Sequence, residues 1–182
     1  MSRIVYSTGT VEYIEMKFDE NSDKMLKQLQ KGVFITTKKN NKVNTMTIAW
    51  GGINFVWGKP VFIAYVRYSR DTYQMLEHSD EFTINVPLNK KLNKALGFCG
   101  SKSGRDYDKI EECNLNLLES RVVKPPILSD CEMHYECKVI YKQAMEPGNI
   151  LESVKDRYYP SNDYHVIYYG EIVDSYIIKG EK

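Results

Sequence analysis

The strongest constraint on the fold is an alternating run in the last third of the chain. From Met133 to Lys142, apolar or aromatic residues occupy every second position. Successive side chains of a strand point to opposite faces, so this period of two predicts a long antiparallel strand. Runs of β-branched and aromatic residues predict further strands. They lie at Val33–Thr37, from Val43 onward, at Ile53–Trp57, Val61–Val66 and Glu81–Val86, at Tyr164–Ile178 with a bend at Gly170, near Arg121–Val123, and as an edge strand at Thr10–Glu15.

Short helical segments separate these strands. Lys24–Lys31 follows a cluster of N-cap residues and ends at Gly32, which is typical of an amphipathic helix. Many strands with short inserted helices predict a mainly β fold, a closed antiparallel barrel with helices at its rim, as one domain over residues 1–182. The other expected helices are Thr72–His78, capped by Asp71, Asn89–Leu96, stopped at Gly97, Asp106–Cys113 and Ile150–Tyr158.

Charge and cysteine content exclude several classes of function. The 25 Lys and Arg residues are balanced by 24 Asp and Glu residues without a block of either sign, which argues against nucleic acid or a membrane surface as a partner. The chain has neither a signal-peptide pattern nor an apolar run approaching the ~20 residues of a membrane span, so we expect a cytoplasmic protein. The four cysteines lack metal-ligand spacing, so we expect free thiols and no metal site.

The segment Arg67–Thr72 carries donors suited to a phosphate. Arg67 and Arg70 can donate charge-assisted hydrogen bonds to phosphate oxygens. Ser69 and Thr72 add hydroxyls, and a helix that begins near Thr72 adds free N–H groups. The alternative is a surface cluster of ion pairs that caps a helix, and this segment alone favours that alternative.

The segment Asn44–Gly52 is suited to a flat polar ring. Its small residues let a ligand approach the backbone, while soft and aromatic side chains offer surface for a ring. A strand with a glycine bulge and a core tryptophan explains the same composition equally well. The candidate contacts are Asn44, Thr45, Met46, Thr47, Trp50 and Gly51.

A third candidate is the segment Cys99–Asp106, with two glycines, two serines and two basic residues before an expected helix. Such a loop can form an anion-binding nest, although it lacks the Gly-Lys-Ser/Thr ending of a P-loop. The alternative is a plain connector between helices. His165, near a strand start, is a further residue that can line a pocket. The candidate contacts in the loop are Cys99, Gly100, Ser101 and Ser103.

Together, these segments resemble the flavin reductase-like proteins of the FMN-binding split-barrel class, in the subgroup that includes flavoredoxins. The resemblance covers roughly Gly32 to Ile172. It implies a Greek-key split barrel that forms a homodimer and holds FMN near the subunit interface, with the phosphate at Ser69, Arg70 and Thr72 and the ring against Thr45–Thr47. It rests on the runs Asn44–Gly52, Arg67–Tyr73, Glu81–Pro87, Cys99–Lys109, Glu136–Gln143 and Tyr164–His165.

The resemblance also implies an oxidoreductase that reduces flavin with NAD(P)H and passes the reduced flavin or its electrons to an acceptor. The chain has no Rossmann fingerprint, so a nicotinamide would have to stack on the flavin in an open cleft. No residue is assigned to catalysis. One alternative is a flavoredoxin-type electron-transfer protein whose FMN is reduced by a redox protein. The other is an OB-like barrel that binds nucleic acid or another partner without a cofactor.

Overall fold

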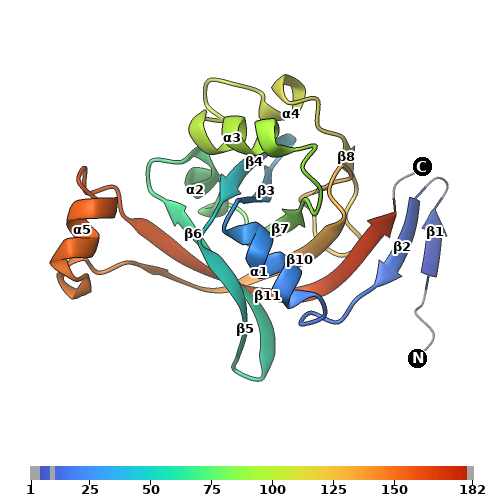
Figure 1. The fold of residues 1–182 in the computed structure, drawn as a ribbon, viewed down its shortest axis with the longest axis horizontal. Coiled ribbons are helices and arrows are strands. Elements are labelled where there is room, and N and C mark those ends of the chain that lie inside the picture. The colour runs from blue at the N-terminus through green and yellow to red at the C-terminus, as the bar shows by residue number, and fades with distance from the viewer. Residues whose placement is uncertain (1–4, 9–10, 180–182) are drawn as a thin grey trace.

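One antiparallel sheet forms the body of the molecule (Figure 1). The computed structural model describes residues 5–8 and 11–179. Nine of the described strands join this sheet in the order β1-β2-β11-β10-β7-β3-β4, and β6 pairs with both β11 and β5. The strands are β1 (Val5–Thr8), β2 (Val11–Glu15), β3 (Val33–Lys39), β4 (Lys42–Ile48), β5 (Gly51–Val56), β6 (Lys59–Arg67), β7 (Glu81–Val86), β10 (Met133–Ala144) and β11 (His165–Lys179), with β8 (Leu117–Leu118) and β9 (Ile127–Leu128) as a separate pair.

The long strand β11 pairs with two different strands along one of its edges. Its first half, His165–Glu171, pairs with β6, and its last residues, Tyr176–Lys179, pair with β2. Opposite Gly170 the register between β10 and β11 shifts by one residue. Gly170 packs so closely against Phe82 that any side chain there would overlap the ring. The extra residue of this shift is Ile140 on β10, and the bulge on β11 itself lies at Val173, so the bend predicted at Gly170 is misplaced. Such bulges increase the local twist of a sheet.

Helices gather at one end of the barrel (Figure 1). α2 (Asp71–Leu76), α3 (Asn93–Ser101) and α4 (Lys109–Glu112) lie beside β3 and β4, while α1 (Ser22–Leu29) crosses in front of the sheet. α5 (Glu152–Tyr158) follows the short 3-10 turn Pro147–Asn149 and projects as an arm. No helix in the described part of the chain is long and apolar enough to cross a membrane.

The strand β10 is buried on both faces where it begins. All five residues from Met133 to Cys137 are buried, including the polar members of the alternation. Met133 and Tyr135 belong to the main core, while His134 and Glu136 lie on the opposite face. That second face is covered by the segment between α4 and β10, which the sequence pattern of β10 does not reveal.

The strand predicted near Arg121–Val123 is wrong. The backbone N–H groups of these three residues donate instead to the Glu136 carboxylate, at 2.7 to 3.0 Å. A buried carboxylate thus replaces a neighbouring strand as the partner of this segment. The edge assignment for Thr10–Glu15 also fails where it can be tested, because β2 lies between β1 and β11; Thr10 lies outside the described residues.

The expected helix Asn89–Leu96 is displaced toward the C-terminus. α3 runs through Gly97 and Gly100 to Ser101, so neither glycine stops it. Leu96 and Cys99 lie in a second buried cluster, and this packing outweighs the cost of about 1 kcal/mol for each helical glycine. The helix expected over Asp106–Cys113 is shorter than predicted, since α4 begins only after the Asp108 cap.

Candidate functional site

Three segments that are far apart in the sequence meet at the helical end of the barrel. Asn44 on β4 donates from its side-chain amide to the Thr72 hydroxyl at 2.9 Å, and both side chains are buried. Arg105 donates to the backbone carbonyl of Ser69 at 2.6 Å, joining the loop after α3 to the turn before α2. The three stretches predicted as ligand contacts are therefore neighbours in space.

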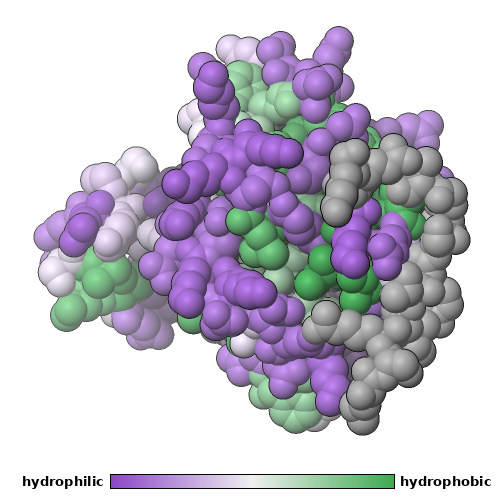
Figure 2. All heavy atoms as spheres, turned by 45° about the vertical axis from the view of Figure 1, so that its right-hand side comes forward, coloured by the Kyte–Doolittle hydropathy of each residue, from purple (hydrophilic) through white to green (hydrophobic). Residues whose placement is uncertain are grey.

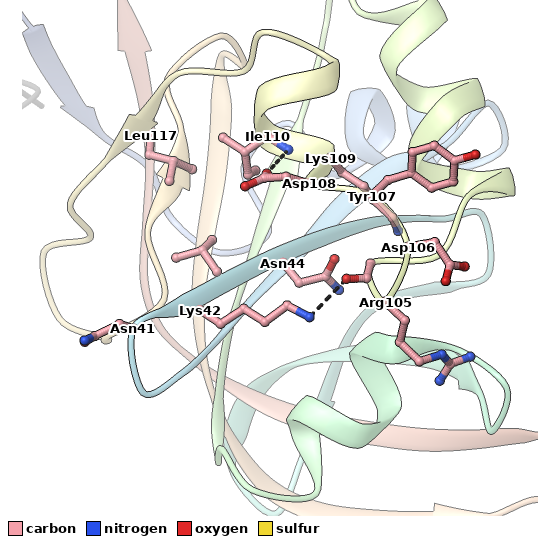
Figure 3. A pocket seen from close by; sticks show the side chains of 12 residues that line it. Asn41, Lys42, Asn44, Arg105, Asp106, Tyr107, Asp108, Lys109, Ile110 and Leu117 are labelled. Carbon is pink, nitrogen blue, oxygen red and sulfur yellow. Dashed lines mark hydrogen bonds between the residues drawn. The ribbon is translucent and has the colours of Figure 1, made fainter.

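Lys42 ties the same segments together from one side (Figure 3). Its ammonium contacts the Asp71 carboxylate at 3.1 Å and donates to the Gly104 carbonyl at 3.0 Å. Asp71 therefore forms an ion pair, and the N-cap position of α2 that it was expected to fill belongs to Arg70. Lys42 and Gly104 border a hollow of about 530 Å³ between β4 and the segment 104–110.

The strand β4 presents an open edge to the site. Among the described strands it pairs only with β3, so every second residue keeps its N–H and C=O outside the ladder. The Thr45 carbonyl accepts a hydrogen bond from the Lys109 ammonium at 3.0 Å, which places the Thr45 backbone on this open edge. The period of two puts the Thr47 backbone on the same edge. Thr45 is fully buried and Lys109 occupies its carbonyl, so a ligand lying here would meet the backbone of Thr47.

The predicted side chains on β4 are used inside the protein. The Thr45 hydroxyl is fully buried and receives a hydrogen bond from Thr36 at 3.0 Å. The Thr47 hydroxyl donates to the Leu96 carbonyl at 2.7 Å, which fixes α3 against the strand. Met46 packs in the main core. These side chains are therefore not free to bind a ligand. What this strand offers a ligand is its backbone, and the threonine side chains are small.

A smaller hollow of about 140 Å³ lies at the C-terminal end of β4. Trp50 forms one wall, with its ring centroid 4.8 Å from that of His165. The pairing of His165 with Arg67 between β11 and β6 brings this wall together, and sequence spacing alone does not show that register. The hollow is lined by Met46, Thr47, Ile48, Ala49, Trp50, Tyr65, Arg67, Arg70 and His165.

His165 contributes a neutral wall to this hollow. Its Nδ1 lies 2.8 Å from the Tyr159 hydroxyl. The pKa of His165 is lowered to about 4, mainly by burial and also by the Arg67 and Arg70 guanidiniums, while the Asp163 carboxylate opposes the shift. The positive charge of the hollow at neutral pH therefore comes from its arginines.

Two of the predicted phosphate contacts hold the segment that follows α5. Arg67 donates to the backbone carbonyls of Tyr158 and Asp163. Ser69 donates to the Asp163 carboxylate from its backbone N–H at 3.1 Å and from its hydroxyl at 2.6 Å. These contacts fix the base of the arm against the turn before α2.

Arg70 differs from its neighbours. Its side chain is half-buried and lines the smaller hollow. Its guanidinium makes no hydrogen bond or ion pair with any residue in 5–8 or 11–179. The turn that Arg67 and Ser69 hold in place thus presents one charged donor group to the hollow.

Lys109 is a buried cation that the sequence analysis did not single out. Its ammonium donates to the carbonyls of Thr45 at 3.0 Å and Cys99 at 3.2 Å, and no carboxylate of the described chain lies within ion-pair distance. Burial lowers the pKa of Lys109, the nearby Cys99 thiol opposes this, and Arg70 adds to it. Its position between α3 and β4 depends on tertiary packing, and a lysine in a polar segment gives no sequence signal of burial.

The expected loop at Cys99 is wrong, because three of its four candidate residues belong to α3. Cys99 is fully buried, and the Ser101 hydroxyl donates to a carbonyl one turn earlier in the helix. Gly100 approaches Thr47, whose Cβ would lie 3.4 Å from an added side chain. The Ser103 hydroxyl accepts a hydrogen bond from an N–H two residues later. These residues form a helical wall beside β4.

Gly51 has a structural explanation. Its φ of +146° suits glycine, and any side chain there would overlap the Ile63 carbonyl oxygen on β6. The close pairing of β5 with β6 therefore accounts for this glycine without a ligand.

The sequence profile of the flavin reductase like domain matches residues 26–182. The chain belongs to the flavin reductase like domain family. A relative from Archaeoglobus fulgidus, named an uncharacterized protein, is 27% identical over 132 residues, which are 72% of this chain and 64% of that protein.

Solved structures share the fold of this flavin reductase like domain. The FMN-binding domain of a flavin reductases-like enzyme from Shewanella baltica has a TM-score of 0.64 at 19% identity, covering 94% of this chain and 79% of that one. The flavoredoxin from Methanosarcina acetivorans has a TM-score of 0.63 at 18% identity, with 83% and 68% covered. The flavoredoxin of Desulfovibrio vulgaris has a TM-score of 0.61 at 22% identity, with 83% and 69% covered. The predicted mainly β split barrel is confirmed.

Proposed function

We propose that this protein binds FMN and acts as a flavin-dependent oxidoreductase. The observation that carries the proposal is Arg70, a half-buried guanidinium in the smaller hollow with no partner in the described chain. Removing a charge from water without a partner is costly, and a phosphate monoester would offset that cost with charge-assisted hydrogen bonds. Family membership and the FMN-binding proteins with the same fold support the same cofactor.

The residues around Arg70 suit the remainder of FMN. The open edge of β4 offers the backbone of Thr47 to the polar edge of a flat ring, and Trp50 offers an aromatic surface. Lys109 adds positive charge behind that edge. When bound, FMN supplies the hydride and electron chemistry, while these residues orient the ring and set its electrostatic surroundings.

For the electron donor we propose NAD(P)H, with the reduced flavin or its electrons passed to an acceptor. The smaller hollow, about 140 Å³, is below the ~300–1,000 Å³ of pockets that enclose small molecules. This chain alone therefore encloses only part of a ligand of the size of FMN. The rest of the flavin would stay exposed, so a nicotinamide can approach it. The same openness also suits a redox protein as the donor, as in a flavoredoxin-type carrier.

We propose further that two copies associate. Among residues 11–179, the three most exposed large apolar side chains are Leu151 beside α5 and Phe55 and Trp57 on the β5–β6 hairpin. Figure 2 shows apolar atoms at the end of the projecting arm and at the foot of the molecule, where the hairpin lies. Burying these residues against a second copy would remove them from water. Light scattering coupled to size-exclusion chromatography tests this, and a mass of one chain would contradict it.

Anaerobic mixing separates the two redox hypotheses. The FMN-loaded protein is mixed with NADH or NADPH while the flavin absorption band is followed. Rapid bleaching at substoichiometric protein supports the oxidoreductase. If the band persists with both nicotinamides and bleaches only with a reduced redox protein, the carrier hypothesis replaces it. A protein that takes up no FMN contradicts both.

A further inference from the structure

Two of the four thiols lie side by side, although the sequence spacing of the cysteines showed no pair. The Cys99 sulfur on α3 is 3.9 Å from the Cys113 sulfur at the C-cap of α4. Cys99 is fully buried, while Cys113 is half-buried. Cys131 is buried in the same apolar cluster as Cys99 and Cys137 in the main core, and neither has a sulfur partner among the described residues.

The geometry points to a redox modification site: we propose that Cys99 and Cys113 form a reversible intramolecular disulfide when the protein meets a hydroperoxide. A disulfide has a sulfur–sulfur distance of about 2.05 Å, so the two sulfurs must approach by about 2 Å. α4 has only four residues, and Glu111, Glu112 and Asn114 around Cys113 are exposed. Lys109 holds the start of α4 in place, whereas the C-terminal end of this helix faces solvent and can make this movement with little loss of buried contact.

The difference in exposure assigns the order of the reaction. Cys113 is the thiol that a small peroxide can reach, so its sulfur attacks one peroxide oxygen, the oxygen–oxygen bond breaks, and one water leaves. The resulting sulfenic acid lies beside Cys99, whose sulfur attacks it, forming the disulfide and releasing a second water. In sum, two thiols lose two electrons and two protons, and one hydrogen peroxide becomes two waters.

Burial sets the rate of this reaction. Burial raises the pKa of the Cys99 thiol to about 12 and also raises the pKa of Cys113. The thiolate is the nucleophile, so disulfide formation is slow at neutral pH and accelerates as the pH rises. Slow oxidation fits a site that responds to sustained peroxide, which reduced flavins produce when they react with oxygen.

The thiol pair adjoins the wall of the proposed flavin site. The Cys99 carbonyl accepts a hydrogen bond from Lys109, and Lys109 begins the helix that ends at Cys113. A disulfide would therefore fix α4 and its buried cation to α3. We expect the oxidised protein to have a higher unfolding temperature than the reduced protein, because the bond constrains the unfolded chain.

Peptide mapping of the full-length protein tests the proposal without requiring any variant to fold. The protein is treated with hydrogen peroxide or with dithiothreitol, denatured, alkylated and analysed by intact mass and by proteolysis. The expected result is loss of two alkylated thiols, a mass lower by about 2 Da before alkylation, and a cross-linked peptide pair containing Cys99 and Cys113, all reversed by dithiothreitol.

Cys113→Ser should abolish the cross-link, whereas Cys131→Ala should retain it. Three results would overturn the proposal: four alkylated thiols after peroxide, a cross-link through Cys131 or Cys137, or oxidation of Cys113 to the sulfinic acid with Cys99 still free. Because the readout is covalent mass, it stands apart from the test of FMN binding.

Discussion

The Lys109 ammonium donates a hydrogen bond to the Thr45 carbonyl at 3.0 Å, which places a buried cation on the open edge of β4. The cost of removing an ammonium from water is met here by carbonyl oxygens alone within the described chain. An anionic ligand at this edge would interact favourably with the charge. Cation and open edge thus form one unit of the proposed flavin site.

Lys109→Met should weaken FMN binding more than it weakens the fold. We expect a loss of about 1–2 kcal/mol in binding free energy, roughly tenfold in Kd, because a nearby positive charge disappears. The free energy of unfolding should change little, since an apolar side chain of similar length avoids the desolvation cost. Flavin fluorescence titration and urea denaturation measure the two quantities. Lys94→Met, at an exposed position on α3, is the matched control, and equal affinities in the two variants would contradict the role of Lys109.

Glu136→Ala should destabilise the protein by about 3–5 kcal/mol, because a buried acceptor is removed from several donors at once. The carboxylate receives three backbone N–H groups from Arg121–Val123 and the Tyr176 hydroxyl at 2.6 Å. Glu136→Gln keeps part of this acceptor capacity and should lose less. Urea denaturation at pH 7 gives the values, with exposed Glu119→Ala as the control. Similar midpoints for Glu136→Ala and the control would show that the segment Arg121–Val123 holds without the carboxylate.

The stability of the fold should fall as the pH drops from about 6.5 to about 4. Burial lowers the pKa of His165 to about 4 in the folded protein, whereas a histidine in the unfolded chain titrates near 6.5. Between these values the unfolded state binds a proton that the folded state does not, so acidification favours unfolding. For His165 alone this amounts to about 1.6 kcal/mol between pH 6.5 and pH 5.

Urea denaturation of the wild type and of His165→Phe at both pH values measures this contribution. The variant should show the weaker dependence on pH, while exposed His78→Gln should keep that of the wild type. An unchanged slope in His165→Phe would mean that folding does not lower the pKa of this imidazole.

Local patterns predicted the strands well because the physics that forms them is local. β7 matches its predicted bounds. The irregularity of β11 was misplaced at Gly170, because the close packing of that glycine against Phe82 does not interrupt its pairing with β6. The ends of α3 could not be predicted in this way. The packing of Leu96 and Cys99 keeps the helix intact through its two glycines. Burial of Glu136 likewise depends on a distant segment that covers the second face of β10.

The sequence predicted which segments form the candidate site, but not which of their side chains face it. Sequence analysis selected the three segments that meet beside β4, and Arg70 lines the hollow there. It could not show that Arg67 and Ser69 are engaged with the segment after α5, since that contact spans more than 90 residues. Lys109 was missed for the same reason: only the packed structure shows that its ammonium is buried.

The most direct measurement is a flavin titration of the purified wild-type protein and Arg70→Ala. The wild type should bind FMN at one site for each chain. Arg70→Ala should lose about 1–3 kcal/mol of binding free energy, because a charge-assisted contact to the phosphate disappears in a shielded hollow. Arg157→Ala, an exposed arginine on α5, should bind as the wild type does. Failure of the wild-type protein to take up FMN, or equal affinity in all three proteins, would contradict the proposed site.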